Sequence, residues 1–176
     1  MKGMETMDIA AKPTSMTRVI SLYVNGDCHE VAVKPRDMLI DVIRDTIGLT
    51  GSKASCESGT CGACTMLVDG KPVLACITLA VECDGKRIET VEGLSDGDTL
   101  SSIQEAFLDQ GAVQCGFCTP GMLMSATALL RSNPKPNRQE INKALEGNLC
   151  RCTGYNAIID AVLQASGQDG VKPVMK

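Results

Sequence analysis

Residues 56–64 read Cys-Glu-Ser-Gly-Thr-Cys-Gly-Ala-Cys, so three cysteines lie within one short segment. Three thiols can converge from such a segment only if the backbone turns sharply and passes close to the sulfurs. Gly59 and Gly62 allow this, because glycine tolerates conformations that other residues avoid. The backbone N–H groups of Ser58 and Thr60 could donate hydrogen bonds to negatively charged sulfurs. The segment is therefore suited to bind a metal centre.

The spacing of the three cysteines, C-x4-C-x2-C, is typical of plant-type [2Fe–2S] ferredoxins. We expect Cys76 to be the fourth ligand, since it lies on a strand predicted to pair with the strand that leaves the loop; Cys83 is a less well placed competitor. A structural zinc site usually has two separated Cys pairs, and a thioredoxin-like dithiol would leave two of the four without a role. The sequence predicts a first [2Fe–2S] cluster on Cys56, Cys61, Cys64 and Cys76.

A second group contains Cys115 and Cys118, followed later in the chain by Cys150 and Cys152. Spacing alone leaves zinc open here, because two separated pairs also suit zinc. The pairs fall at predicted helix ends, and the N-terminus of a helix over residues 120–131 would favour an anionic cluster. Together with the ferredoxin-type loop, this favours a second [2Fe–2S] cluster. We expect this site, between packed helices, to be less exposed than the first, under a surface loop.

The other cysteines, Cys28 and Cys83, are interpreted as small structural thiols. The single histidine, His29, is predicted to lie at the surface, and one histidine is too few for a Rieske centre.

The composition of the chain limits the classes of protein to which it can belong. The chain has 176 residues and ten cysteines, and residues 1–17 contain neither an apolar secretory segment nor an Arg pair. Many cysteines in a reducing compartment indicate metal binding, not disulfides. The net charge of −4 without a basic stripe argues against nucleic acid, and no apolar run is long enough to span a membrane. We expect a cytoplasmic protein.

The order of predicted elements indicates an α+β fold. Hairpins are expected over residues 18–33, around Asn25-Gly26, and over residues 65–76, around Asp69-Gly70. A helix is expected over residues 39–47 and a strand over 87–91. Four short helices follow, expected to start at Gly97-Asp98, at Thr119 as N-cap, at Asn137, which has capping-box spacing to Glu140, and near Asn156, the last ending near Ala165. The predicted organisation is a flexible leader (1–17), a ferredoxin-like domain (18–95), a helical cluster-binding domain (96–167) and a tail (168–176).

Three segments resemble the small iron–sulfur subunits of the xanthine oxidase family of molybdenum hydroxylases. They are Cys56–Val68, Gln114–Met122 (Gln-Cys-Gly-Phe-Cys-Thr-Pro-Gly-Met) and Gly147–Tyr155 (Gly-Asn-Leu-Cys-Arg-Cys-Thr-Gly-Tyr). Among members of the family, the chain is most similar to the small subunits of three-subunit bacterial enzymes. Examples are 4-hydroxybenzoyl-CoA reductase, carbon monoxide dehydrogenase and quinoline-type oxidoreductases.

The resemblance implies a β-grasp ferredoxin-like domain followed by a four-helix bundle. All eight cysteines of the two sets match the family's ligands, and Gln114 and Cys152 match positions beside the pterin of the molybdenum cofactor. It also implies a large molybdopterin-binding subunit, a medium FAD-binding subunit, and assembly as a dimer of heterotrimers.

We therefore expect a non-catalytic subunit that relays single electrons between the molybdopterin and a flavin subunit or other acceptor. The chain itself offers no evident catalytic base or nucleophile. A free-standing ferredoxin and a zinc-stabilised interaction module are the alternatives. The sequence does not name the substrate.

Overall fold

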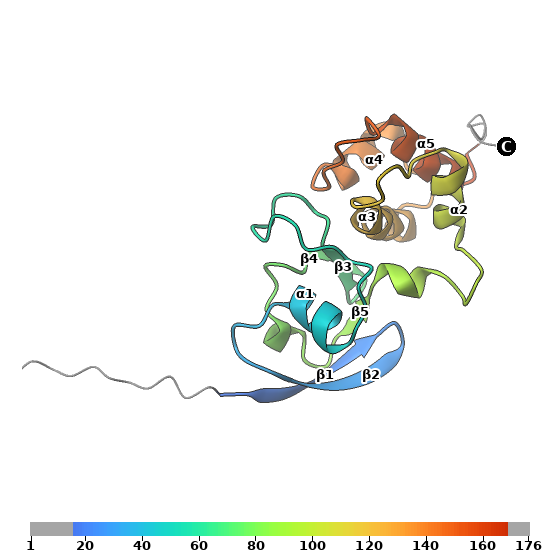
Figure 1. The fold of residues 1–176 in the computed structure, drawn as a ribbon. Coiled ribbons are helices and arrows are strands. Elements are labelled where there is room, and N and C mark those ends of the chain that lie inside the picture. Colours follow the sequence, from blue (N-terminus) through green and yellow to red (C-terminus); the bar gives the residue numbers. More distant parts are fainter. Residues whose placement is uncertain (1–15, 169–176) are drawn as a thin grey trace, which may run out of the picture.

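The computed structural model describes residues 16–168 and contains a mixed sheet and a group of helices (Figure 1). The predicted leader up to residue 15 and the tail from residue 169 lie outside the described residues. The sheet has the strand order β2-β1-β5-β3-β4, in which only β1 and β5 run parallel. Its strands are β1 (Arg18–Val24), β2 (Asp27–Val33), β3 (Thr65–Val68), β4 (Lys71–Leu74) and β5 (Arg87–Glu89).

Both predicted hairpins are confirmed. The first turn has φ of +51° at Asn25 and +100° at Gly26, and the second has +49° at Asp69 and +76° at Gly70. Positive φ at both central residues is what a type I′ hairpin turn requires, and the twist of this turn matches that of the strands. The second hairpin ends at Leu74, so Cys76 follows the strand instead of lying on it.

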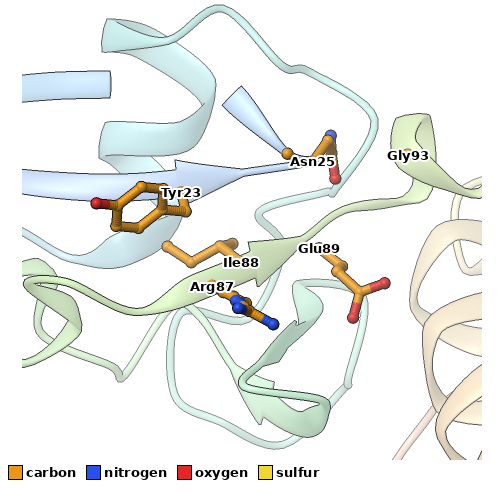
Figure 2. A pocket seen from close by; sticks show the side chains of 7 residues that line it. Tyr23, Asn25, Arg87, Ile88, Glu89 and Gly93 are labelled. Atoms are coloured by element: carbon orange, nitrogen blue, oxygen red, sulfur yellow. The ribbon is translucent and has the colours of Figure 1, made fainter. Parts of the chain in front are cut away.

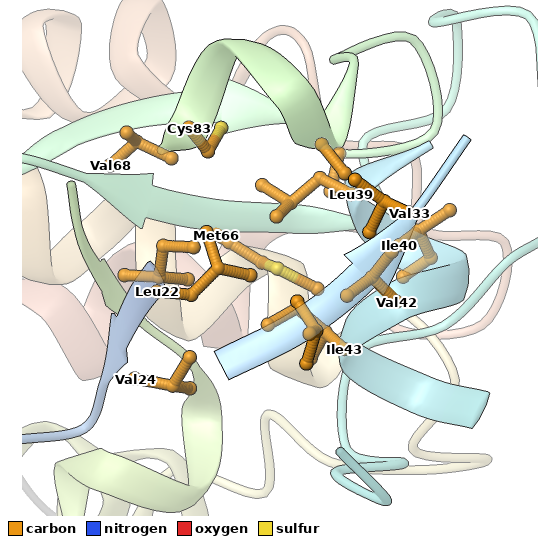
Figure 3. Close-up of a cluster of buried hydrophobic side chains, with 14 of the residues drawn as sticks. Leu22, Val24, Val33, Leu39, Ile40, Val42, Ile43, Met66, Val68 and Cys83 are labelled. Carbon is orange, nitrogen blue, oxygen red and sulfur yellow. The ribbon is translucent and has the colours of Figure 1, made fainter. Parts of the chain in front are cut away.

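One hydrophobic core lies between the sheet and the short helix α1 (Leu39–Asp41), which continues as a π-helical segment (Val42–Thr46). Figure 3 shows aliphatic side chains of the sheet packed against Leu39, Ile40 and Ile43 of this helix. Gly48, with φ of +90°, ends the helix as expected from the sequence. This core fixes both ends of the cysteine loop that joins the helix to β3.

The helical region comprises α2 (Ser102–Asp109), α3 (Thr119–Ser132), α4 (Arg138–Leu145) and α5 (Asn156–Ala165). Their buried faces form a second core, around Phe107, Met122 and Ile158. Helix α3 contacts β3 and β4, and in Figure 1 it lies between the sheet and the other helices. The two halves therefore meet along α3. No helix of residues 16–168 has the length and apolar character that a membrane span needs.

The helix starts predicted from the sequence agree only in part with those in the structure. The prediction for α2 was wrong: it begins at Ser102, not Gly97-Asp98, because Ser101 and Gln104 form a capping box. The N-cap of α3 is Cys118 and not Thr119. At α4 the predicted capping box of Asn137 and Glu140 is present. The expected strand over residues 87–91 ends at Glu89 and is followed by a short 3-10 turn, Val91–Leu94.

A shallow hollow of about 520 Å³ lies beside the paired strands β1 and β5 (Figure 2). Tyr23, Asn25 and Arg87 line it, and none of the ten cysteines does. The side chain of Asn25 has a structural role, because it makes two hydrogen bonds of 2.9 Å with Thr90. The hollow is therefore separate from the cysteine sites.

Candidate iron–sulfur sites

The loop that carries the first cysteine set is anchored from its base. The guanidinium of Arg44 donates to the carbonyl oxygens of Thr50 (2.8 Å) and Ser52 (2.6 Å), and Lys53 N–H donates to Ala63 O (3.2 Å). Gly59 has φ of +74°, and a Cβ there would lie 2.7 Å from Cδ1 of Ile77. The positive φ favours glycine at this turn, whereas the nearby Cδ1 ends a flexible side chain that can move aside.

The first set is partly enclosed. Cys64 and Cys76 are buried, at 2% and 5% exposure, whereas Cys56 and Cys61 are half-buried. Cys83 lies instead in the sheet core, 1% exposed, and is seen in Figure 3 near Val68. The structure thus places Cys76, and not Cys83, beside Cys64. Burial of Cys83 agrees with its interpretation as a small structural thiol, since its 3-10 turn packs onto the sheet.

Protonation differs within the first set. The pKa of Cys56 is lowered to about 5, because Ser58 N–H and both the hydroxyl and N–H of Thr60 donate to its sulfur. The Thr60 N–H lies 3.4 Å from that sulfur. Burial raises the pKa of Cys64 to about 11. Since a metal ligand must be a thiolate, Cys56 is ready to bind at neutral pH, whereas Cys64 loses its proton only when a cation compensates.

The second set lies at the ends of helices. Cys115 and Cys118 precede and cap α3, whereas Cys150 and Cys152 occupy the connection between α4 and α5. Cys115 Sγ and Cys152 Sγ are 3.6 Å apart. The turn that carries Cys150 is fixed by Tyr155, whose hydroxyl accepts a 2.9 Å hydrogen bond from Cys150 N–H.

The thiols of the second set also differ in pKa. Burial, followed by the neighbouring Cys150 thiol, raises the pKa of Cys118 to about 12. For Cys150, burial acts to raise the pKa, but hydrogen bonds from the hydroxyl and N–H of Thr153 and from Cys118 outweigh it, and the net pKa is lowered. The Thr153 hydroxyl lies 3.0 Å from that sulfur. Here Thr153 has the role that Thr60 has in the first loop.

The expected order of exposure was wrong. Cys115 and Cys152 are exposed and the other two thiols of the second set are half-buried, so the second set is the more open one. Its cysteines lie beyond the helix ends and not between the packed helix faces. The neighbouring side chains Gln114, Phe117 and Leu149 are exposed as well, at 46% for Phe117 and 56% for Leu149. This open end is a surface that another protein could cover.

The eight thiols of the two sets lie in four pairs. Within residues 16–168, no three His, Cys, Asp or Glu side chains are arranged to hold a single metal ion. A [2Fe–2S] cluster has a different requirement, because its four protein ligands are divided between two irons. Such a division matches the four thiol pairs that lie within hydrogen-bonding reach: Cys56 with Cys61, Cys64 with Cys76, Cys115 with Cys152, and Cys118 with Cys150.

The two sets lie next to each other, although they are far apart in sequence. Leu149 N–H, one residue before Cys150, donates a 2.8 Å hydrogen bond to the carbonyl oxygen of Cys61. A hollow of about 360 Å³, lined by Cys61, Cys150, Phe117 and Tyr155 among others, opens over this junction. The fold therefore brings both sites to one region of the molecule.

Sequence reasoning missed the residues that support the thiols. Thr153, which donates to the Cys150 sulfur, and Tyr155, which accepts from Cys150 N–H, were part of a recognised motif, but no role was inferred for them. The signal available was their position within five residues of Cys150, where a sulfur usually needs hydrogen-bond donors.

Comparisons with known proteins agree with two cluster-binding units. Residues 27–103 match a family described as a 2Fe-2S iron-sulfur cluster binding domain, and residues 90–163 match one described as a [2Fe-2S] binding domain. The chain is 55% identical over 161 residues to the nicotine 6-hydroxylase small subunit of Paenarthrobacter nicotinovorans, covering 91% of this chain and 97% of that subunit. It is 47% identical over 146 residues to the nicotinate dehydrogenase small FeS subunit of Eubacterium barkeri, covering 83% and 93%.

A solved structure shows the same fold. The chain superposes on a chain of quinoline 2-oxidoreductase from Pseudomonas putida 86 with a TM-score of 0.81 and 48% sequence identity. The match covers 87% of this chain and 98% of that chain.

Proposed function

Because the chain belongs to the small iron–sulfur subunits of the xanthine oxidase family of molybdenum hydroxylases, we propose that it relays single electrons between a molybdopterin-binding large subunit and an FAD-binding medium subunit. It is the iron–sulfur, non-catalytic subunit of an oxidoreductase, and its two cluster-binding domains imply two [2Fe–2S] clusters. When bound, such clusters supply one-electron redox chemistry, while the protein sets their burial and hydrogen bonding.

The assignment of ligands is part of the proposal. Cys56, Cys61, Cys64 and Cys76 would hold the first cluster, and Cys115, Cys118, Cys150 and Cys152 the second. The observation that carries it is the arrangement of these eight thiols as four pairs in two adjacent sets. Thr60 and Thr153 would donate hydrogen bonds to ligand sulfurs, which lowers the free energy of the thiolate form.

The open end of the second set would face the molybdopterin subunit. Gln114 and Cys152 are both exposed there and would lie against the pterin. Phe117 and Leu149 give the same surface an apolar character, and buried aromatic anchors dominate many protein interfaces. Electrons would then enter at the second cluster and leave through the first toward the flavin.

The finer architecture and assembly also belong to the proposal. We assign residues 18–95 to a β-grasp domain and residues 96–167 to a four-helix bundle, and we expect a dimer of heterotrimers in the cytoplasm. The antiparallel hairpins around a mixed sheet and the four packed helices support the first part. The small-subunit relatives support assembly with larger partner subunits.

Co-expression with the large subunit tests the function. A tagged form of this chain should bring down a brown complex whose absorption spectrum bleaches on addition of dithionite. A brown chain that purifies without the co-expressed large subunit would support a diffusing ferredoxin instead. A colourless chain containing zinc would support an interaction module.

A further inference from the structure

One buried amide, that of Asn148, lies at the junction between the two halves of the molecule. This residue follows α4, is 5% exposed, and precedes the second cysteine pair by two residues. Its Nδ2 donates to Gly62 O (2.9 Å) and to Thr65 Oγ1 (3.3 Å), both at the end of the first cysteine loop. Its Oδ1 accepts a 2.7 Å hydrogen bond from Ser125 Oγ of α3. The amide thus uses both of its donors and its acceptor, and joins three segments.

The backbones around this amide approach as closely as glycine permits. A Cβ on Gly62 would lie 2.3 Å from Gly147 O, and a Cβ on Gly121 would lie 2.2 Å from Gly62 O. Real Cβ atoms do not come so near to a backbone oxygen, so any larger residue at either position would separate the halves. Gly121 is within helix α3, where alanine is otherwise favoured over glycine by about 1 kcal/mol. Contact between the halves, and not helix formation, explains glycine at this position.

We propose that Asn148 is the positioning residue that fixes the separation of the two iron–sulfur sites, acting with the glycine contact between Gly62 and Gly121. The inference rests on the proposed function, since it concerns the same two cysteine sets. Asn148 touches no thiol; it acts through the backbone on either side of Cys61 and Cys150. Leu149, the next residue, makes the 2.8 Å hydrogen bond to Cys61 O.

The geometry makes the separation sensitive to this one side chain. Removing the amide leaves Ser125 Oγ without its acceptor and takes one donor from Gly62 O, both in a buried setting. A buried polar group that loses its partner is costly, so the halves would open to let water in. The thiols would keep their own loops and hydrogen bonds, and each cluster would stay in place while its distance from the other became variable.

Asn148→Ala in the full-length chain carrying both clusters tests the proposal. The iron content should equal that of the wild type. Exchange of the Leu149 amide hydrogen should be at least about tenfold faster, because a lost buried hydrogen bond makes local opening easier. Electron paramagnetic resonance of the fully reduced chain should show weaker or broadened spin coupling between the two clusters. Asn142→Ala, an exposed asparagine on α4, should change neither quantity.

Gly121→Ala supplies a second variant that removes no polar group. It should give the same faster exchange and broadened coupling with full iron content. Gly147→Ala is its matched control, because a Cβ there meets nothing within 4 Å. Wild-type exchange and coupling in both Asn148→Ala and Gly121→Ala would overturn the proposal. Loss of iron in Gly121→Ala but not in Gly147→Ala would also overturn it, since the contact would then be needed to hold a cluster.

The test separates this inference from the proposed function. If the wild-type chain contained zinc or no metal, the electron-transfer function would fail on the metal analysis alone. If the wild type carried both clusters and the variants behaved as the wild type, only the role of Asn148 would fail.

Discussion

The two cysteine sets, each of which we propose to hold a [2Fe–2S] cluster, lie in opposite settings. In the first set, Cys64 and Cys76 are buried beneath a loop, and in the second, Cys115 and Cys152 are exposed at helix ends. Each half of the chain has its own buried hydrophobic core, so the difference in thiol exposure does not come from a loosely packed helical region. It arises because a hairpin can cover a loop that returns to it, whereas a helix end faces away from the helices it packs against. The exposed set is therefore the one that we propose a partner covers.

The difference in exposure predicts different properties for the two clusters. A cluster at a covered site is shielded by its own chain, whereas a cluster at an open site takes part of its environment from the partner. Burial and hydrogen bonding set the potential of such clusters, so the two should differ, and the second should change more when the complex forms.

The largest expected effect is the loss of one cluster. Wild-type chain should contain about four iron atoms and four acid-labile sulfides, two of each per cluster. Cys118→Ser should lose half of both, stop electrons that leave molybdenum, and lower the stability of the helical half, because metal binding contributes to folding. Cys61→Ser should lose the same amount, yet still allow substrate to reduce the remaining cluster. Iron and sulfide analysis with anaerobic rapid mixing checks both.

Half the iron in the wild type, or zinc in its place, would contradict the assignment of two clusters. A Cys61→Ser complex in which substrate reduces no cluster would contradict the proposed order of the two sites.

Thiol reactivity gives the next largest effect. In cluster-free chain, Cys56 should be alkylated as a thiolate already at about pH 6.5, because its pKa is lowered to about 5. A cysteine peptide with an ordinary pKa near 8.5, mixed into the same sample, is only about 1% thiolate at that pH. The rate of Cys56 relative to the peptide should fall about 100-fold between pH 6.5 and about pH 9.5, where both are ionised. Mass spectrometry of the labelled peptides measures this ratio.

Two internal controls accompany the labelling. Cys83 is 1% exposed and should stay unlabelled while the chain is folded. Cys64, whose pKa is raised to about 11, should react slowly at both pH values. A ratio for Cys56 that does not change with pH would show that its thiol is not stabilised as a thiolate.

Replacing either of the two cysteines outside the sets should have a smaller effect, and the two replacements should differ in their effect on the free energy of unfolding. Cys28→Ser and Cys83→Ser should both keep full iron content, because neither thiol is among the eight that come together in pairs. Cys28 is exposed, so its replacement should change the free energy of unfolding by less than about 0.5 kcal/mol. Cys83→Ser buries a hydroxyl in the sheet core and should cost about 1–3 kcal/mol. Denaturant unfolding with iron analysis separates the two, and loss of iron in either variant would reveal a wrong ligand assignment.

The smallest effect concerns a surface ion pair between the halves. Arg131 of α3 makes two 2.7 Å hydrogen bonds to the Glu89 carboxylate of β5. The bonds to Arg131 lower the pKa of Glu89 below its usual value, so the pair stabilises the fold above that usual value and loses its effect as pH falls through the lowered one. Arg131→Gln should cost about 0.2–1 kcal/mol at pH 7. This difference from the wild type should vanish in acid.

Arg138→Gln provides the matched comparison. Arg138 pairs with Asp160 at 2.6 Å within the helical half, with similar exposure of both partners. Only Arg131→Gln should also speed up amide exchange at the junction between the halves. Equal effects of the two variants there would show that the Glu89 pair does not hold the halves together.

The sequence predicted local features better than relations between segments. The hairpin at Asn25-Gly26, the capping box at Asn137 and the ends of α5 follow from short-range rules, and all are present. The cysteine sets were recognised from spacing, and the thiols of each set do come together in pairs. Each of these features depends on residues a few positions apart.

The wrong predictions concern features that depend on how separate segments compete or pack against each other. The start of α2 shifted because the Ser101 capping box competed with an apparent start at Gly97, and spacing does not rank two such signals. The exposure of Cys115 and Cys152 depends on where the packed helices end, which the spacing of the cysteines does not tell. The junction at Asn148 joins residues more than eighty positions apart, so no local pattern could indicate it.

The most direct test of the central claim is the magnetic interaction with molybdenum in the assembled complex. Reduced complex containing Cys61→Ser should retain the splitting of the molybdenum signal by a nearby cluster, because the second set, next to exposed Gln114 and Cys152, remains intact. The matched Cys118→Ser complex should lose it. If Cys61→Ser abolished the splitting and Cys118→Ser kept it, the first set would be the one that faces molybdenum, and the proposed order of electron transfer would be reversed.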